Sequence, residues 1–456
     1  MESFLDQVPL SPRTGQTSPF GAMATLQGLC MMGTPGDTLP MVSIGAAFAL
    51  RHKGRVHLVV QPSQLALVAD KLTSSPCFAP LATEKIEVQR DAYKIIFTPP
   101  VGGPPRVERS PKADDKARVE IDHRTWGADT GAQIHVWAPA DEVCDEKNHQ
   151  EWGDVNNVDV NKIAFKKPSY GDFLSMWQVV LSHLDTLLPP SGVLRVTNCY
   201  DQEGNCKLIE AAIDYKHDLQ VRIGSLGMLD ECTEKKFYAV SPLLCPRRFH
   251  LAPKFAKSVD LDAKALQGVI SEPQAVFPSQ ALPPAIVSFL QEPTTVVTLS
   301  STHLGTALQH LLRNTHCLFI CSVEENSLEG HLHWPHPLNL DAVFAEASMV
   351  VHACGVGTAH KVVCSGKPSI CVSLTKEQLS NAKRLEELGV ATHYALQDLM
   401  ADITTQEAFM KALSAPRDNQ RLQLLQAQVL DESDGLSACV TRMTELLDPG
   451  HRTDQV

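Results

Sequence analysis

The sequence predicts an α/β protein made of two doubly wound, Rossmann-like domains that face a cleft. Three observations carry this prediction. The chain has 456 residues, which is enough for two or three domains. Residues 24 to 60 follow a strand, helix, strand pattern, as a parallel crossover requires. Residues 294 to 389 alternate strictly between strands and helices, which is typical of parallel sheets covered by helices.

Composition narrows the class of protein. Hydrophobic residues make up 43% of the chain and charged residues 20%, which supplies buried cores and argues against a mainly disordered chain. The net charge of −12 gives no overall attraction to nucleic acid or anionic lipid. The sequence shows no secretion signal and no apolar run long enough to span a membrane. We therefore expect a cytoplasmic protein whose 13 cysteines are reduced and mostly buried.

The first domain is expected over residues 23 to 245. Residues 1 to 22 are polar and turn-rich and are predicted to form a flexible leader. Strands are predicted at 24 to 33 and 55 to 60, and the helix between them ends at Gly54.

The pattern breaks between about 74 and 165. This region contains charged and Pro/Gly-rich sequence with isolated strand candidates YKIIF and QIHVWA, so it is predicted to be an insertion or a set of long loops. A helical apolar stripe over 173 to 188, the strand GVLRVTN, a helix near 205 to 216 and the strand LQVRIGS are then expected. The Pro-containing segment 241 to 253 is the best linker candidate.

The second domain is expected over residues 246 to 456. Its predicted elements are, in order, the strand TTVVTLSS, the helix HLGTALQHLLR, the strand CLFICSV, the helix LDAVFAEA, the strand MVVHA, the helix GTAHKVVCSG, the strand PSICVSL and the helix NAKRLEELG. Ligands of such a domain are expected at the carboxyl ends of its strands.

Two short segments of the second domain carry the strongest chemical signal. Gly355, Gly357 and Thr358 follow a buried strand and open a helix, and a helix N-terminus with exposed N–H groups can bind a phosphate or diphosphate. The alternative is that these glycines serve only the turn. Glu377 and Gln378 follow the next strand and could hold vicinal sugar hydroxyls, or they could simply form the first turn of a helix.

The stretch HACGVGTAHKVVCSGKPSICVSLTKEQ resembles the HHGGAGT…DQ signature of GT-B UDP-sugar-dependent glycosyltransferases, without a gap between Val351 and Gln378. MGTPGDTLPMVSIGAAFALRHKGRVHLVVQ looks like the GSRGD opening of the sterol and polyketide branch of that family. LPPAIVSFLQEPTTVVTLSS, which contains Ser300, is similar to the segment that opens the family's second domain. The resemblance covers about 25 to 73 and 190 to 395.

The resemblance implies a division of labour between the domains. The second domain would hold the nucleotide sugar, with the diphosphate at Gly355, Gly357 and Thr358. The first would hold the acceptor and supply the general base, which the match places at Asp37, after Gly33 and Thr34 on the same loop. The alternative for Asp37 is a cap of a helix that begins at Thr38. The resemblance implies no metal and no cofactor, because the UDP-sugar is a co-substrate. It also suggests that the C-terminal helix crosses back onto the first domain.

The sequence also departs from the family pattern. Ala353 occupies the place of the diphosphate-binding histidine, and His352 lies one residue earlier, so His352 is either a substrate contact or a buried structural histidine. Pro35 replaces an arginine of the opening motif. Trp334, in HLHWPHPLN, could flank a uracil ring or could pack in the core.

The function expected from these features is hexosyl transfer, with inversion, from a UDP-sugar to a hydroxyl of a small lipophilic acceptor such as a sterol. Its expected partners are the UDP-sugar, the acceptor and transient contact with a membrane to reach a lipid, without nucleic acid. The alternative is a catalytically impaired GT-B-fold protein that binds a ligand or a partner, because Ala353 and Pro35 both fall in the motifs that the chemistry would use.

Overall fold

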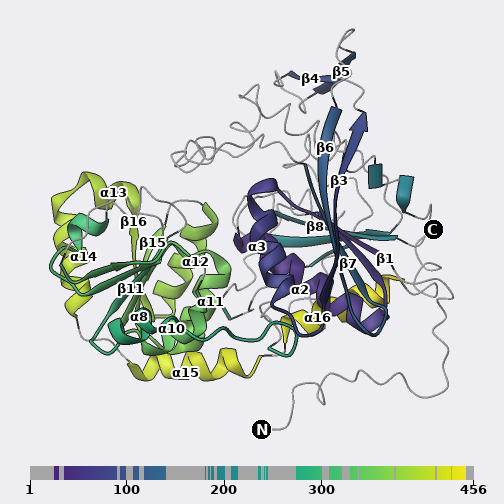
Figure 1. The fold of residues 1–456 in the computed structure, drawn as a ribbon. Coiled ribbons are helices and arrows are strands. Elements are labelled where there is room, and N and C mark those ends of the chain that lie inside the picture. Colours follow the sequence, from purple (N-terminus) through teal and green to yellow (C-terminus); the bar gives the residue numbers. More distant parts are fainter. Residues whose placement is uncertain are drawn as a thin grey trace.

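The computed structural model forms two α/β lobes (Figure 1). It describes residues 25–29, 35–89, 93–98, 106–111, 118–139, 180, 183–184, 186–188, 193–200, 207–213, 235–237, 241, 243–244, 274–299, 308–320, 329–336, 338–373, 376–415, 419–432 and 434–447. The predicted leader, the strand LQVRIGS and most of the predicted linker lie outside these ranges.

The first domain is built on an eight-stranded sheet of order β10-β9-β8-β1-β2-β7-β6-β3. Its strands are β1 (Thr25–Leu29), β2 (Arg55–Val59), β3 (Ala79–Gln89), β6 (Arg118–Gly127), β7 (Gln133–Pro139), β8 (Val193–Tyr200), β9 (Lys207–Ile213) and β10 (Lys235–Phe237). The central strands β8, β1, β2 and β7 are parallel, and the outer strands pair antiparallel. The strands β4 (Tyr93–Thr98) and β5 (Arg106–Pro111) form a separate antiparallel pair.

Within the described residues, three helices contribute to the main core cluster of this domain. They are α2 (Pro35–His52), α3 (Pro62–Thr73) and, from the far end of the chain, α16 (Gly435–Leu447). Leu436, Val440 and Met443 of α16 are buried in one cluster with Met41 and Phe48 of α2. The C-terminal helix therefore does pack on the first domain, where its burial of apolar surface ties the two ends of the chain together.

Side-chain hydrogen bonds add to this contact between α2 and α16. The guanidinium of Arg51 donates to Thr441 at 2.9 Å, and the His52 ring lies 3.0 Å from the Thr444 hydroxyl.

The second domain contains a six-stranded sheet of order β13-β12-β11-β14-β15-β16, parallel throughout. Its strands are β11 (Thr295–Thr298), β12 (Cys317–Ile320), β13 (His331–His333), β14 (Met349–His352), β15 (Ser369–Ser373) and β16 (Ala391–Ala395). The helices are α8 (Pro284–Phe289), α10 (Leu340–Glu346), α11 (Val356–Ser365), α12 (Lys376–Glu387), α13 (Leu396–Ala401), α14 (Ile403–Ser414) and α15 (Asn419–Leu430). Counted within the domain the order is 3-2-1-4-5-6, the Rossmann order, whose direction reverses between β11 and β14.

The predicted fold class is confirmed, and two predictions within the first domain are wrong. The segment near 205 to 216, predicted as a helix, contains strand β9, which pairs antiparallel with β8. Its Leu, Glu and Ala residues favour helix locally, but pairing in the sheet overrides that preference. The region from 74 to 165 is also not simply an insertion, because β7 pairs with the central strand β2 and β6 and β3 continue the sheet beyond it.

A stack of aromatic rings lies on the face of the first sheet away from α2 and α3. Val56 and Leu58 of β2 belong to the core beneath these helices, so the side chain of His57 between them faces the other way. His57 and His135 stack with their ring centroids 4.6 Å apart, and Trp137 stacks on His123 at 3.7 Å.

The histidines of this stack are held in the neutral form. The Trp137 indole donates to His57 Nδ1 at 3.3 Å. Burial, together with the neighbouring histidines and Arg55, lowers the pKa of His57 to about 3. Burial, with His123 and Arg55, lowers the pKa of His135 to about 4.

None of the described helices has the length and apolar character that a membrane crossing requires.

The histidine stack makes the stability of the first domain sensitive to acid. An unfolded histidine binds a proton below about pH 6.5, whereas folded His57 and His135 stay neutral to lower pH. Their contribution is therefore complete above pH 6.5 and is lost as the pH falls from 6.5 toward 4, by at most about 1.4 kcal/mol per pH unit for each histidine. Urea unfolding at pH 7 and pH 5 measures this loss.

A matched pair of variants tests the assignment. His57→Gln is expected to reduce the acid sensitivity, and His336→Gln, at an exposed position, is expected to leave it unchanged. Equal pH dependence of wild type and His57→Gln contradicts the assignment.

Candidate functional site

The strand-to-helix turn after β14 lies where the strand order of the second sheet reverses. The strand ends at His352, Gly355 caps the N-terminus of α11, and the helix begins at Val356. Cys354 has φ of 62°, a left-handed conformation that is uncommon for a residue with a side chain. The turn thus brings the N-terminus of α11 to the edge of the sheet where doubly wound domains bind ligands.

The glycines of this turn are not explained by crowding within the chain. A Cβ atom added at Gly355 or Gly357 meets no described atom within 4 Å. At Gly366, by contrast, φ is 65° and an added Cβ would lie 2.5 Å from Oε1 of Gln426. Gly366 is favoured by its left-handed backbone, whereas Gly355 and Gly357 leave the first turn of α11 open to an approaching group.

Helix α12 is tied to the same turn. The Asn381 side-chain amide donates to the carbonyl of Cys354 at 2.9 Å. Gln378 lies three residues earlier, which is the same face of a helix, and it is 9% exposed. The backbone of Glu377 belongs to the first turn of α12, and its side chain lies outside the described part of the structure. The structure therefore brings the two predicted segments of the second domain together.

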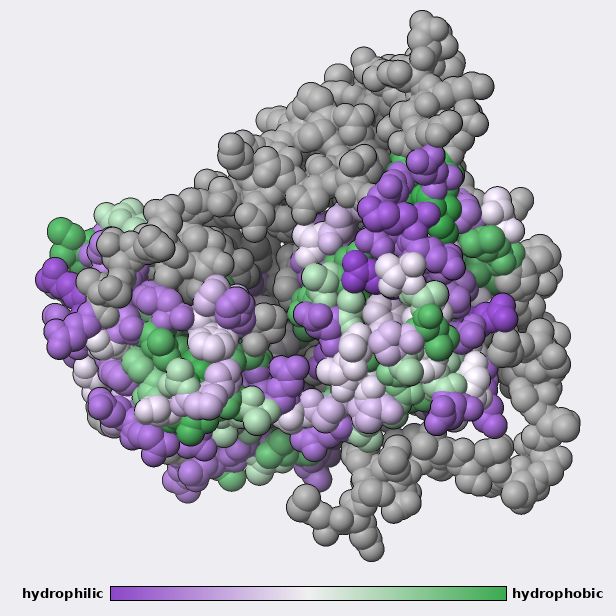
Figure 2. Space-filling model, in the orientation of Figure 1, coloured by the Kyte–Doolittle hydropathy of each residue, from purple (hydrophilic) through white to green (hydrophobic). Residues whose placement is uncertain are grey.

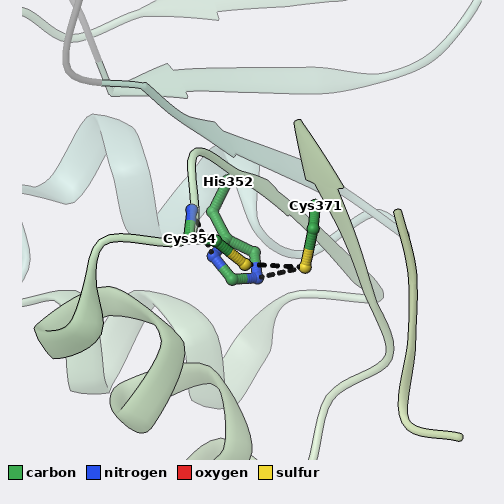
Figure 3. A group of neighbouring side chains, drawn as sticks. All are labelled: His352, Cys354 and Cys371. Carbon is green, nitrogen blue, oxygen red and sulfur yellow. Dashed lines mark hydrogen bonds between the residues drawn. The ribbon is translucent and has the colours of Figure 1, made fainter. Parts of the chain in front are cut away.

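His352 does not reach the open side of the turn. Its ring is fully buried; Nδ1 accepts from the backbone N–H of Cys354 at 3.3 Å, and Nε2 lies 3.7 Å from Sγ of Cys371 (Figure 3). The predicted substrate contact of His352 is not supported, because burial beneath the turn separates the ring from any ligand on the surface of the turn. The structural alternative for His352 is the one observed.

The candidate base lies at the corresponding position of the first domain. Helix α2 begins at Pro35, so Asp37 is inside its first turn and is not the cap of a helix that starts at Thr38. This turn follows the carboxyl end of β1, the strand from which the parallel sheet extends in both directions, to β2 and to β8. The side chain of Asp37 and all of Gly33, Thr34 and Ser300 lie outside the described residues.

Trp334 lies just beyond β13. Its backbone N–H donates to the carbonyl of Phe319 at 2.8 Å, and its ring packs partly on the core around α10. The indole nitrogen is buried and has no hydrogen-bond partner among the described residues. The half-buried position is compatible with a Trp334 ring that flanks uracil and with one that only packs on the core.

Sequence reasoning missed the group formed by His352, Cys354 and Cys371. All three are buried, and one ligand-type atom from each lies within 4.8 Å of the others. His352 and Cys371 are register partners on the neighbouring strands β14 and β15. The two cysteines are 17 residues apart with no local motif, so only strand pairing reveals their proximity.

Comparison with solved structures identifies the fold. TcCGT1, solved in complex with UDP, superposes with a TM-score of 0.52 at 10% identity, over 93% of this chain and 99% of that chain. The calicheamicin glycosyltransferase CalG4 gives 0.46 at 12% identity, over 95% and 99% of the two chains. The glycosyltransferase SnogD from Streptomyces nogalater also gives 0.46 at 12%, over 94% and 100%.

No protein-family profile matches the sequence, and no curated protein matches it. The likeness to TcCGT1 and the two Rossmann-like sheets together give the GT-B fold.

The bond from Asn381 to Cys354 is expected to stabilise the turn. Asn381→Ala removes the donor and leaves the buried carbonyl of Cys354 without this partner, which costs about 1 to 3 kcal/mol. Ser380→Ala, at the exposed neighbouring position, is expected to change stability by less than about 0.5 kcal/mol. Chemical denaturation of both variants measures the difference, and equal effects contradict a specific role for the bond.

Proposed function

We propose that this protein is a glycosyltransferase that moves a hexosyl group from a UDP-sugar to a hydroxyl of a small lipophilic acceptor, such as a sterol, with inversion at the anomeric carbon. The observation that carries the proposal is the open N-terminal turn of α11 at the point where the strand order reverses. The presence of UDP in the similar TcCGT1 structure supports the same conclusion.

The turn supplies the chemistry that a leaving diphosphate needs. Backbone N–H groups near Gly355, Gly357 and Thr358 are unpaired within the helix, and the helix dipole adds partial positive charge there. Negative charge grows on the diphosphate as the glycosidic bond breaks, so these donors stabilise the transition state more than the ground state. In this proposal the positive end of α11 stabilises the leaving diphosphate, and neither a metal nor a cofactor is assigned.

The remaining roles follow from the position of each segment. Glu377 and Gln378, at the start of α12, bind hydroxyls of the sugar, and Trp334 lies against the uracil. Asp37, at the start of α2 in the other domain, takes the proton from the acceptor hydroxyl as it attacks. Figure 2 shows the surface hollowed between the two lobes, where donor and acceptor would meet.

A second candidate function is a GT-B-fold protein that binds a nucleotide sugar or a partner without efficient transfer. Ala353 and the buried ring of His352 favour it, because no imidazole is exposed at the turn. Incubating the full-length chain with a panel of UDP-sugars and a sterol, with product detection by mass spectrometry and UDP affinity by calorimetry, separates the two. Transfer supports the enzyme, binding alone supports the second function, and absence of both contradicts each of them.

A substitution at Gly357 is expected to maintain or raise thermal stability while it weakens UDP binding. Gly357→Ala adds a methyl group that meets no described atom, and alanine favours a helix over glycine by about 0.5 to 1 kcal/mol. We therefore expect equal or higher thermal stability and about 10-fold weaker UDP binding, measured by calorimetry. Ser414→Ala, an exposed change at the end of α14, is expected to leave UDP affinity unchanged. Undiminished UDP binding by a stable Gly357→Ala protein contradicts a diphosphate at this turn.

Asp37 separates the catalytic proposal from a binding function. Asp37→Asn removes the proton acceptor at nearly constant size, so transfer is expected to fall by about 10² to 10⁴ while UDP affinity and Tm change little. Asp70→Asn makes the same change at an exposed position on α3 and is expected to retain full transfer. Equal activity of the two variants rules out Asp37 as the base.

A further inference from the structure

Cys354 and Cys371 approach each other beneath the turn that opens α11. Their Sγ atoms are 2.8 Å apart, closer than unbonded sulfur atoms normally pack and only about 0.8 Å longer than a disulfide bond of about 2.05 Å. Both side chains are fully buried. Cys354 is also held in a left-handed conformation, with φ of 62°. The pair is thus positioned for bond formation at a strained point of the chain.

The hydrogen bonds of His352 favour a thiol pair over a metal site. A histidine that ligates a metal through one ring nitrogen carries a proton on the other and donates it. Here Nδ1 faces a donor, the backbone N–H of Cys354, so the proton belongs on Nε2, which faces Sγ of Cys371. Two sulfurs that share a tetrahedral zinc ion also lie about 3.8 Å apart, given a Zn–S distance of about 2.3 Å. The observed separation is much shorter.

The environment favours the thiolate of Cys371. Burial raises the pKa of this thiol, but the hydrogen bond from Cys354 and the interaction with His352 outweigh it and bring the pKa to about 6. Burial alone raises the pKa of Cys317, on β12 of the same domain, to about 12. A thiolate is the form that reacts with oxidants, so the two buried thiols differ in reactivity.

We propose that Cys354 and Cys371 are a thiol oxidation site that closes to a disulfide on reaction with a peroxide and reopens with a thiol reductant. The Cys371 thiolate attacks one peroxide oxygen, the O–O bond breaks, and Cys371 becomes a sulfenic acid. The departing hydroxide takes up the proton that Cys371 released when the thiolate formed and becomes the first water. The Cys354 sulfur then attacks the sulfur of Cys371, the S–O bond breaks, and water leaves with the thiol proton. Two thiols are oxidised by two electrons, and one peroxide is reduced to two waters.

Cys354 and Cys371 lie beneath the turn that opens α11, so a disulfide between them would change how this turn binds an anion. Cys354 directly precedes Gly355, whose side of the turn is open. The sulfurs themselves are buried, and in this proposal a small peroxide enters through the turn. Closure joins the turn to β15 and removes the negative charge of the thiolate below the N-terminus of α11. Both effects favour an anion at that terminus, the first by preorganising the turn and the second by removing repulsion. This consequence rests on the proposed diphosphate site, whereas disulfide formation does not.

Peptide mapping of the full-length protein tests the disulfide. Reduced protein is treated with hydrogen peroxide, unfolded, alkylated and digested, and the cysteine peptides are quantified by mass spectrometry. We expect a cross-linked peptide that joins Cys354 to Cys371 and disappears after dithiothreitol, while Cys317 remains alkylated. Because wild type is used, the result does not depend on whether a variant folds.

Three outcomes overturn the proposal. The first is equal alkylation of Cys354 and Cys371 before and after peroxide, and the second is oxidation of either one without the cross-link. The third is protection of both thiols by added Zn²⁺ that a chelator reverses, which assigns the cluster to a metal. Cys371→Ser is expected to abolish the cross-link, and Cys317→Ser, the matched buried control, is expected to retain it.

UDP affinity of the two forms tests the coupling. The oxidised protein is expected to bind UDP about 5-fold or more tightly than the reduced protein, within the ordinary range of coupling between sites, and Cys371→Ser is expected to lose the difference. Equal UDP affinity of the two forms overturns the coupling. Failure of both forms to bind UDP contradicts the proposed function, while the cross-link still decides the thiol site.

Discussion

The left-handed backbone of Cys354 is the constraint on which the second domain's principal turn depends. It turns the chain from β14 into α11 within three residues and directs the first N–H groups of the helix outward. The backbone of Cys354 is held by hydrogen bonds on both sides, because its N–H donates to His352 and its carbonyl accepts from Asn381. Both partners are buried, as is Cys354 itself. The strained residue is therefore fixed within the protein interior, and the open side of the turn lies at Gly355 and Gly357.

The architecture could be predicted because parallel strands buried on both faces are continuous apolar runs between amphipathic helices. The runs at Thr295–Thr298 and Met349–His352 are strands in the structure. The prediction failed where local composition and tertiary pairing disagree. Lys207–Ile213 has the residues of a helix and the pairing of a strand. The strand candidate QIHVWA is β7 in the structure, but its pairing with the central strand β2 was not predicted, and β6 was hidden by the irregular sequence that surrounds it.

The candidate site was predictable to the extent that it consists of local motifs. Gly355 to Thr358 form one strand-to-helix turn, and Gln378 lies in the helix that Asn381 fastens to it. The cluster under the turn could not be predicted, because it depends on the register that pairs His352 with Cys371. Register is a long-range property that no residue spacing within either strand encodes.

The one-residue displacement of the histidine from the family position has a definite structural cost. Ala353 is 6% exposed and packs with Val351 and Val372 on one face of the sheet. His352, with Cys354 and Cys371, lies on the other face. An imidazole placed at Ala353 would therefore enter an apolar cluster, where burial without a hydrogen bond is costly. A histidine at position 353 alone is thus not equivalent to a diphosphate contact, and the proposed function therefore assigns stabilisation of the leaving group to the backbone donors of α11.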